Sequence, residues 1–310
     1  MTSGVFLTSL YGSLAQGLLH APVVIGIFMS LRIMKRPDLT VEGTFAFGAA
    51  VAMTFLNRGA HFMISLIAAV IAGSIAGLAT ALIHTKLKID GIISGLLVTM
   101  ALFSINLFVM GGNNISAPLD RFIFHPVRGR LQGLGLLPFD AMLFSYIVVG
   151  AITLIIVIVF LFLLYGSLLG LSIRATGDNE RMASSNGIST DKCKIISLVI
   201  SNAITGLAAA LVAQQQNGAN VNSGTGVLIN GLASLVIGEI ITPKNAQIHT
   251  RLLFTALGSF IYFSCIALVV SAGLLSTDWT RLLTAALALL ALCMPKLREI
   301  RFRKRAGVAR

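Results

Sequence analysis

The sequence predicts an all-α fold, a bundle of helices that crosses a lipid bilayer about eight to ten times. Its 310 residues are 56% hydrophobic and only 11% charged, whereas a soluble domain carries about 25% charged residues. The mean hydropathy is +0.91, and the apolar residues form continuous runs rather than the alternating pattern of a membrane β-barrel. Backbone polar groups must be paired inside a bilayer, so each run is expected to be helical.

The apolar runs approach the length of about 20 residues that a membrane-spanning helix needs. They cover residues 4–31, 39–56, 62–83, 91–110, 141–164, 195–215, 225–242, 251–272 and 279–295. Pro22 in the first run predicts a kink or a division into two pieces. Gly73 and Gly77 in the third run have the four-residue spacing that allows two helices to pack closely.

Lysine and arginine gather in every second connection, which places these connections in the cytoplasm. The basic residues that follow the odd-numbered runs are Arg32, Lys35, Arg36, Lys86, Lys88, Arg174, Arg181, Lys192, Lys194, Lys244, Arg251 and those of the tail. The N-terminus is therefore expected outside and the C-terminus inside. The outer loop 111–140 is an exception, because it carries Arg121, Arg128 and Arg130. We expect one transmembrane domain, residues 1–295, and a basic cytoplasmic tail, residues 296–310.

The net charge of +12 indicates contact with anionic lipid rather than nucleic acid, because the basic residues lie at the ends of apolar runs and in the tail. No HExxH, GxSxG or P-loop pattern occurs, the five histidines are scattered, and the three cysteines fit no zinc site. We therefore expect no catalytic residue, no metal site and no cofactor bound by this chain. Energy for any transport must come from a partner or an ion gradient.

Polar side chains within the apolar runs are candidates for a substrate pathway, because they are costly in lipid. The candidates are Thr40, Glu42, Thr44, Asn106, Asn202 and Asn230. The first three begin a run, where a helix N-terminus at mid-depth would offer backbone N–H groups to a substrate carboxylate. The alternative is that Asp38 and Glu42 simply cap this helix. The amide-rich stretch 213–222 is either an external turn or the lining of a wet cavity, and Glu239 marks the end of a run.

A polar segment, residues 174–194, separates the fifth and sixth runs and reads RATGDNERMASSNGISTDKCK. It predicts a cytoplasmic helix of about two turns that lies parallel to the membrane. Asp178 and Asn179 can cap it, and Glu180 falls in its first turn. The remaining residues assigned to it are Arg181, Met182, Ala183, Ser184, Ser185 and the terminating pair Asn186 and Gly187. Met182 and Ala183 are expected to present a small apolar face.

This segment, with Arg174, Ala175, Ala183, Gly187 and Ile188 in position and the stretch SNAITGLAAALVAQ after it, resembles the permease subunits of ABC importers of the branched-chain amino acid and ribose class. The stretch PDLTVEGTFAFGAAVA is similar to the permease of an importer group linked to tryptophan and tyrosine uptake. The resemblance covers about residues 37–296. It departs at residues 239–243, where this chain lacks much of the family's glycine cluster.

The resemblance implies a plasma-membrane permease subunit that imports a small solute, such as an aromatic or branched-chain amino acid. It implies a second permease copy, a cytoplasmic ABC ATPase that holds ATP and Mg²⁺, and an extracytoplasmic substrate-binding protein. Residues 178–186 would form the coupling helix in a groove of the ATPase, and the outer loop would help to dock the binding protein.

Two alternatives come from the residues themselves. An ion-coupled secondary transporter would need buried acidic residues in several spans, and only Glu42 and Glu239 are candidates. A membrane scaffold without transport would have a fully apolar centre, so a polar cavity lined by Glu42, Asn106 and Asn202 would argue against it.

Overall fold

Helices make up nearly all of the regular structure in the computed structural model, which describes residues 3–271, apart from 134, 136, 244 and 245, together with residues 285, 286 and 289. The α-helices are α1 Ser3–Phe28, α2 Thr40–Asn57, α3 Phe62–Lys86, α4 Gly91–Met110, α5 Phe124–Gly133, α6 Pro138–Gly166, α7 Leu168–Asp178, α8 Glu180–Ser185, α9 Thr190–Gln215, α10 Val227–Ile241 and α11 Ile248–Ser271. A π-helical turn η1, Met29–Ile33, a 3₁₀ turn η2, Leu119–Arg121, and two short strands, β1 Asn114–Ile115 and β2 Ala219–Asn220, complete the described elements. The predicted all-α class is confirmed.

Six helices of the described chain are long and apolar enough to cross a membrane. They are α3, α4, α6, α9, α11 and the continuous helix formed by α1 and η1. The predicted runs 39–56 and 225–242 correspond to α2 and α10, which have 18 and 15 residues and are not among the six. The run 279–295 and the basic tail fall almost wholly outside the described residues.

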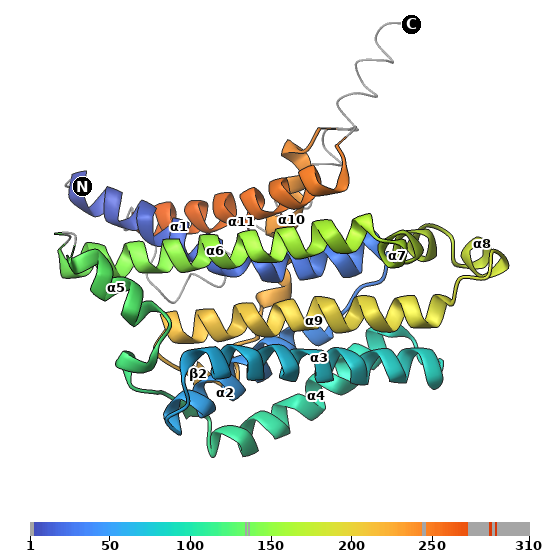
Figure 1. The fold of residues 1–310 in the computed structure, drawn as a ribbon, viewed down its shortest axis with the longest axis horizontal. Helices are drawn as coiled ribbons and strands as arrows, with labels where there is room; N and C mark the ends of the chain where they lie inside the picture. The colour runs from blue at the N-terminus through green and yellow to red at the C-terminus, as the bar shows by residue number, and fades with distance from the viewer. Residues whose placement is uncertain are drawn as a thin grey trace, which may run out of the picture.

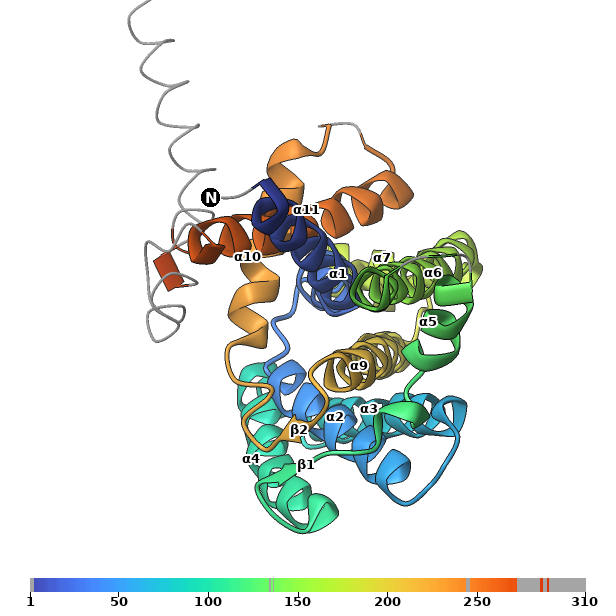
Figure 2. The ribbon, with the colours of Figure 1, turned by 90° about the vertical axis from the view of Figure 1, so that its left-hand side faces the viewer.

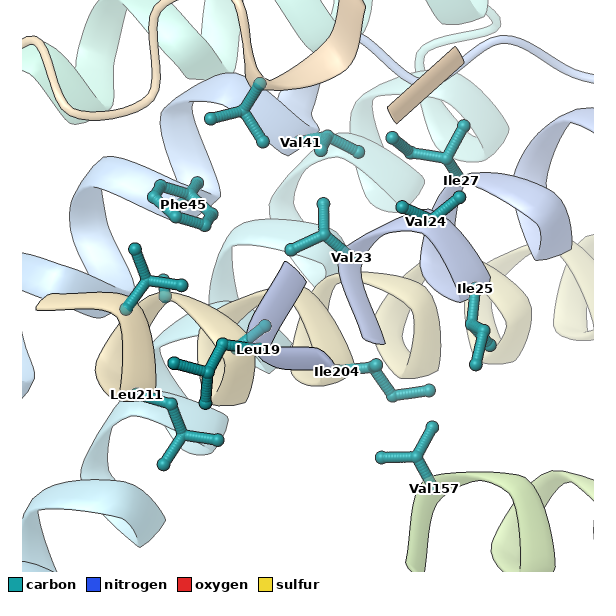
Figure 3. Packing of buried hydrophobic residues seen from close by; sticks show 14 of the residues in the cluster. Leu19, Val23, Val24, Ile25, Ile27, Val41, Phe45, Val157, Ile204 and Leu211 are labelled. Carbon is teal, nitrogen blue, oxygen red and sulfur yellow. The ribbon is translucent and has the colours of Figure 1, made fainter. Parts of the chain in front are cut away.

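Helix α9 lies between two groups of helices (Figures 1 and 2). On one side are α2, α3 and α4; on the other are α1, α6 and α11. Helix α10 bridges the two groups, because it leaves the β2 region and packs on α11. Leu19 of α1, Phe45 of α2 and Leu211 of α9 are buried in the shared core (Figure 3). Helix α9 therefore packs against both groups, which also meet directly where His20 of α1 stacks on Phe45 of α2.

Small residues bring α3 and α9 into close contact, as the spacing of Gly73 and Gly77 predicts. A Cβ atom on Gly73 would overlap the backbone carbonyl oxygen of Asn202, and one on Gly77 would overlap that of Leu198. Gly206 of α9 approaches the backbone of Ala69 in the same way. Close packing of this kind is a main source of helix association in lipid, where there is no hydrophobic driving force between helices.

Of the two outcomes predicted for Pro22, a kink or a division of the first run, the division is wrong. Helix α1 continues through Pro22 to Phe28, and the change in winding comes later, in the π-helical turn η1. The helix packs on α6, α9, α10 and α11, and such neighbours allow a transmembrane helix to tolerate a proline.

The two ends of the bundle carry different connections. The basic residues Arg32, Lys35, Arg36 and Lys194 meet acidic residues at the end where α8 lies. At the opposite end, β1 pairs with β2 in antiparallel register, Asn114 with Asn220 and Ile115 with Ala219. The predicted sidedness remains a prediction. Of the connections it assigns to the cytoplasm, those that carry Arg36, His84 and Glu180 lie together at one end.

The predicted outer loop 111–140 contains β1, η2 and α5, and it ends earlier than expected because α6 begins at Pro138. Arg121 donates from Nη1 to the carbonyl oxygens of Leu56, at 2.9 Å, and Asn57, at 3.1 Å. These carbonyls lie at the C-terminus of α2, where helix carbonyls lack partners within the helix, and that of Leu56 also accepts from the N–H of Gly59, at 3.1 Å. A basic residue stands in this loop because it satisfies and stabilises a helix C-terminus.

Candidate functional site

A cavity of about 400 Å³ lies between the first turns of α2, the middle of α4 and the segment that follows β2. Its lining residues are Glu42, Gly43, Ala46, Thr99, Met100, Phe103, Asn106, Val221, Asn222, Gly224 and Thr225. Among the residues that the structure describes, Glu42 is the only ionisable side chain in this lining. The cavity thus combines one carboxylate, several neutral polar groups and an apolar wall formed by Met100 and Phe103.

Glu42 joins the cavity to the N-terminus of α10. Its Oε1 accepts a hydrogen bond from the backbone N–H of Gly226, at 3.1 Å, and Gly226 is the N-cap of α10 in a left-handed conformation with φ of 82°. Gly224 lies so close to the backbone of Glu42 that a Cβ atom there would overlap its carbonyl oxygen. A carboxylate at a helix N-terminus is stabilised by the helix dipole. Glu42 therefore caps α10, while Oδ1 of Asp38 accepts from the N–H of Thr40, at 2.9 Å, at the start of α2.

Asn106 contributes an unpaired amide oxygen beside the cavity. Its side chain is 1% exposed, and Oδ1 has no hydrogen-bond partner in the described part of the chain. A buried acceptor without a partner costs about 1–3 kcal/mol. A solute or water molecule that donates a hydrogen bond in the cavity would recover that cost.

Three of the predicted pathway residues lie in a buried polar cluster instead of the cavity lining. Thr44 donates to Oδ1 of Asn202, at 2.7 Å, and Nδ2 of Asn202 donates to Oδ2 of Asp38, at 2.7 Å. The hydroxyl groups of Thr40 and Thr80 are 2.7 Å apart. This cluster, consisting of Asp38, Thr40, Thr44, Thr80 and Asn202, ties the start of α2 to α3 and α9.

The last predicted pathway residue, Asn230, accepts a hydrogen bond from the hydroxyl of Tyr262, at 2.8 Å. It joins α10 to α11 and does not line the cavity. The structure thus places Glu42 and Asn106 in the cavity lining. The other four residues, Thr40, Thr44, Asn202 and Asn230, form hydrogen bonds between helices.

Sequence reasoning missed the cavity residues Thr99, Phe103, Asn222 and Thr225. A signal for the first two was present in α4. Thr99, Phe103 and Asn106 are spaced by four and three residues, so they share one face of the helix. The polarity of Asn222 and Thr225 was visible, but their approach to α2 depends on the fold of the segment after β2.

Helix α8 occupies the predicted polar segment and lies at the end of the bundle, where Figure 1 views it nearly along its axis while α6 and α9 run across the view. Oδ1 of Asn179 accepts from the N–H of Met182, at 3.1 Å, so Asn179 is the N-cap. Glu180 is in the first turn, and Gly187 has a φ of 80° just after the C-cap residue Asn186. The cap, the first turn and the left-handed stop are confirmed. The helix spans Glu180–Ser185, and Asp178 belongs to the end of α7.

The expected apolar face of this helix needs a correction. Met182 is 64% exposed, whereas Ala183 is only 3% exposed. Ala183 faces the protein interior, so Met182 is the apolar residue that α8 presents. Arg181, Ser184, Ser185, Asn186 and Gly187 are exposed with it.

Glu180 anchors α8 to two other elements. Its Oε2 accepts from Nη2 of Arg36, at 2.6 Å, and its Oε1 accepts from Nζ of Lys194. The Lys194 side chain is 9% exposed, and its hydrogen bond holds the pKa of the Glu180 carboxyl below its ordinary value. Arg36 also lies 2.9 Å from Nε2 of His84. Because Arg36 belongs to the connection that enters α2, this carboxylate links α8 to the helix that carries Glu42.

Comparison with known proteins connects this arrangement with a family. The family model described as "Branched-chain amino acid transport system / permease component" matches residues 9–292. The tyrosine transport system permease protein of Clostridioides difficile (strain R20291) is 34% identical over 272 residues, which is 88% of this chain and 86% of that protein.

More distant relatives are named for other solutes. The autoinducer 2 import system permease protein LsrC of Yersinia pseudotuberculosis is 26% identical over 70% of this chain and 59% of its own length. The L-arabinose ABC transporter permease protein AraH of Azospirillum brasilense is 23% identical over 73% of this chain and 64% of its own length. The solved structure of PsaBC from Streptococcus pneumoniae in complex with Fab superposes with a TM-score of 0.51 at 13% identity and covers 97% of this chain and 96% of its own; it shares the fold.

Proposed function

This chain belongs to the permease family of branched-chain amino acid transport systems, and on that premise we propose that two copies of it form the import pathway for an aromatic amino acid. Membership makes the chain a permease subunit of an ABC importer, a multi-pass protein of the plasma membrane and not itself an enzyme. Such a subunit works with a cytoplasmic ATPase and an extracytoplasmic substrate-binding protein. We propose that ATP and Mg²⁺ are held by the ATPase alone. The ion-coupled transporter and the scaffold are therefore set aside.

The residues that line the cavity favour an amino acid over an uncharged solute. Glu42 is its only ionisable lining residue, and a lone carboxylate in a confined space attracts a cationic group. The α-ammonium of an amino acid supplies that charge, whereas an uncharged sugar does not. The unpaired Oδ1 of Asn106 would accept a hydrogen bond from the α-ammonium, and the amide of Asn222 offers N–H donors to the substrate carboxylate. Phe103 gives an aromatic side chain a surface on which to stack.

A second copy of the chain would complete the pathway. Met100 and Phe103 line the cavity and are also exposed on the surface of α4. Exposed residues that line a cavity mark an open side, which a neighbouring copy would close. The resemblance to permeases of ABC importers implies two permease subunits for each pathway, and two identical copies are the simplest arrangement.

The exposed residues of α8 would contact the ATPase. Met182 provides an apolar contact, and Arg181, Ser184 and Asn186 surround it with polar groups. A capped helix held by ion pairs on Glu180 moves as a unit, so it transmits a displacement that a flexible loop would absorb. Glu180 would pass this displacement to Arg36 and hence to α2.

Uptake by proteoliposomes that contain the permease, its ATPase and its binding protein tests the proposal. ATP-driven accumulation of tyrosine is expected to exceed that of arabinose by at least about tenfold, because a site built for hydrogen bonds and charge rejects solutes that lack the matching groups. The variant Glu42→Gln is expected to lose most tyrosine uptake, since the glutamine still accepts from Gly226 but carries no charge.

The matched control is Asp90→Asn, which removes one negative charge from the N-cap of α4 and keeps a residue that caps well. Normal tyrosine uptake by Glu42→Gln would refute the role of the carboxylate. Equal uptake of tyrosine and arabinose by the wild type would refute the amino acid assignment as a whole.

A further inference from the structure

A second groove, remote from the transport cavity, lies at the basic end of the bundle. It has a volume of about 290 Å³ and is lined by Phe28, Arg32, Ile33, Arg174, Asp178, Ala246, Gln247, Ile248 and Arg251. Its arginines come from η1, α7 and α11, which are far apart in the sequence. The fold therefore brings three guanidinium groups to one groove.

The acidic residues nearby leave this groove with an excess of positive charge. Asp178 lines it but is paired with Lys35, at 2.8 Å, and Glu239, in the adjoining hollow that shares Phe28 and Arg251, pairs with Arg32. Within the described chain, Arg174 has no carboxylate partner, and Arg251 donates from Nε to the carbonyl oxygen of Ala246, at 3.2 Å. With Arg32 paired to Glu239 and Asp178 paired to Lys35, Arg174 and Arg251 are the two lining cations whose charge no described carboxylate balances, and they favour an anion in the groove.

The surroundings of the groove favour a lipid. Ile248 lines it, and the ring of the next residue, His249, contacts the ring of Phe162 on α6, with centroids 5.8 Å apart. Around Phe162, α6 exposes Val159, Phe160 and Leu163, and this helix is the most hydropathic of the spans. The groove thus meets a surface that faces acyl chains.

We propose that the groove binds the phosphate of an anionic phospholipid headgroup, with Arg174 and Arg251 as its principal ligands and Arg32 as a third. Guanidinium groups bind phosphate oxygens through paired, charge-assisted hydrogen bonds. Basic hollows between helices on the cytoplasmic side are suited to acidic headgroups. The acyl chains of the lipid would lie along α6. One lipid would then connect η1, α7 and α11 beside the coupling helix.

Native mass spectrometry of the purified full-length permease, titrated with phosphatidylglycerol or phosphatidylcholine, tests this site. We expect phosphatidylglycerol to be retained preferentially and the double variant Arg174→Gln/Arg251→Gln to bind it about tenfold or more weakly, since it loses two charged hydrogen-bond donors. The matched control is Lys86→Gln/Lys192→Gln, which removes two exposed charges from the same end but outside the groove. The variant Arg174→Lys/Arg251→Lys should keep part of the affinity.

Three results would overturn the proposal. One is equal retention of the two lipids by the wild type. Another is protection by inorganic phosphate that equals the protection by phosphatidylglycerol in a thermal unfolding assay, which would assign the groove to a soluble phosphate. The third is loss of ATPase co-purification in the glutamine variant with lipid binding unchanged, which would place the arginines in the ATPase interface. If the glutamine variant folds poorly, the lipid affinity of the lysine variant and the lipid preference of the wild type decide the question.

Discussion

Nη2 of Arg36 lies 2.6 Å from Oε2 of Glu180, and this ion pair joins α8 to the connection that leads into α2. Two residues after Arg36, Asp38 is bound by Asn202 of α9, and four residues further on, Glu42 lines the cavity. A displacement of α8 therefore has a short route of charged and hydrogen-bonded contacts to the cavity wall.

Replacing Glu180 with glutamine should weaken the link between ATP hydrolysis and transport. The amide keeps the size of the side chain but loses its charge-assisted bonds to Arg36 and Lys194, and for this partly exposed group the loss is about 1 kcal/mol. We expect the stimulation of ATPase activity by the loaded binding protein to fall about fivefold while basal hydrolysis persists. Asp178→Asn, which breaks the more exposed pair with Lys35, is the control and should retain most stimulation. Equal stimulation in wild type and Glu180→Gln would exclude this role.

The same carboxylate predicts a dependence of stability on pH. The hydrogen bond from Lys194 lowers the pKa of Glu180 from its ordinary value of 4.5. A group with a lowered pKa in the folded state stabilises the fold above its ordinary pKa, and this contribution is lost as the pH falls through the lowered value. The melting temperature of the wild type should therefore exceed that of Glu180→Gln at pH 7, and the difference should shrink below pH 4.5. A difference that stays constant to the lowest pH that the protein tolerates would contradict the assignment.

Replacing Asn106 with leucine should keep or raise the stability of the protein and lower transport. Leucine has nearly the same size and removes the unpaired buried oxygen, so Asn106→Leu is expected to unfold at the same or a higher temperature, with a gain of up to about 2 kcal/mol. Tyrosine uptake should fall several-fold, because the cavity loses a polar group. Thermal unfolding and uptake are measured on the same preparation. A destabilised Asn106→Leu with normal uptake would show that the side chain has a structural role only.

The contact between α3 and α9 should not tolerate a larger residue at Gly73. Alanine there would overlap the carbonyl oxygen of Asn202, and overpacking of this kind costs about 1–3 kcal/mol. Gly112→Ala is the control, since a Cβ atom at Gly112 meets no other atom within 4 Å. Size-exclusion profiles and melting temperatures should separate the two variants. An unchanged melting temperature for Gly73→Ala would show that the helices can move apart at little cost.

Hydropathy, the alternation of basic connections and the capping pattern at Asn179 and Gly187 predicted the helical fold and the place of α8, because these features depend on composition and on neighbours in the sequence. The lining of the cavity was harder to predict. Thr44, Asn106 and Asn202 are all polar residues in apolar runs, yet only Asn106 reaches the cavity. The rotation of each helix decides this, and packing against distant segments sets the rotation.

The orientation of Ala183 could not be predicted from the sequence for the same reason. In the sequence it stands beside Met182 as a second apolar residue of α8, but successive residues of a helix point about 100° apart. The structure turns Ala183 inward and Met182 outward. The role of Glu42 in capping α10 was equally hidden, because 184 residues separate its carboxylate from the N–H of Gly226.

Co-purification of the ATPase with the tagged permease from mild detergent tests the central claim, that α8 connects this permease to its ATPase. The deciding variant is Met182→Arg, because Met182 is exposed and its replacement leaves the core intact, while Asn113→Arg adds the same charge at the opposite, exposed end. We expect a stoichiometric ATPase with the wild type and with Asn113→Arg, and its loss with Met182→Arg in a permease that remains monodisperse. Full recovery of the ATPase with Met182→Arg would contradict the assignment of α8 as the coupling helix.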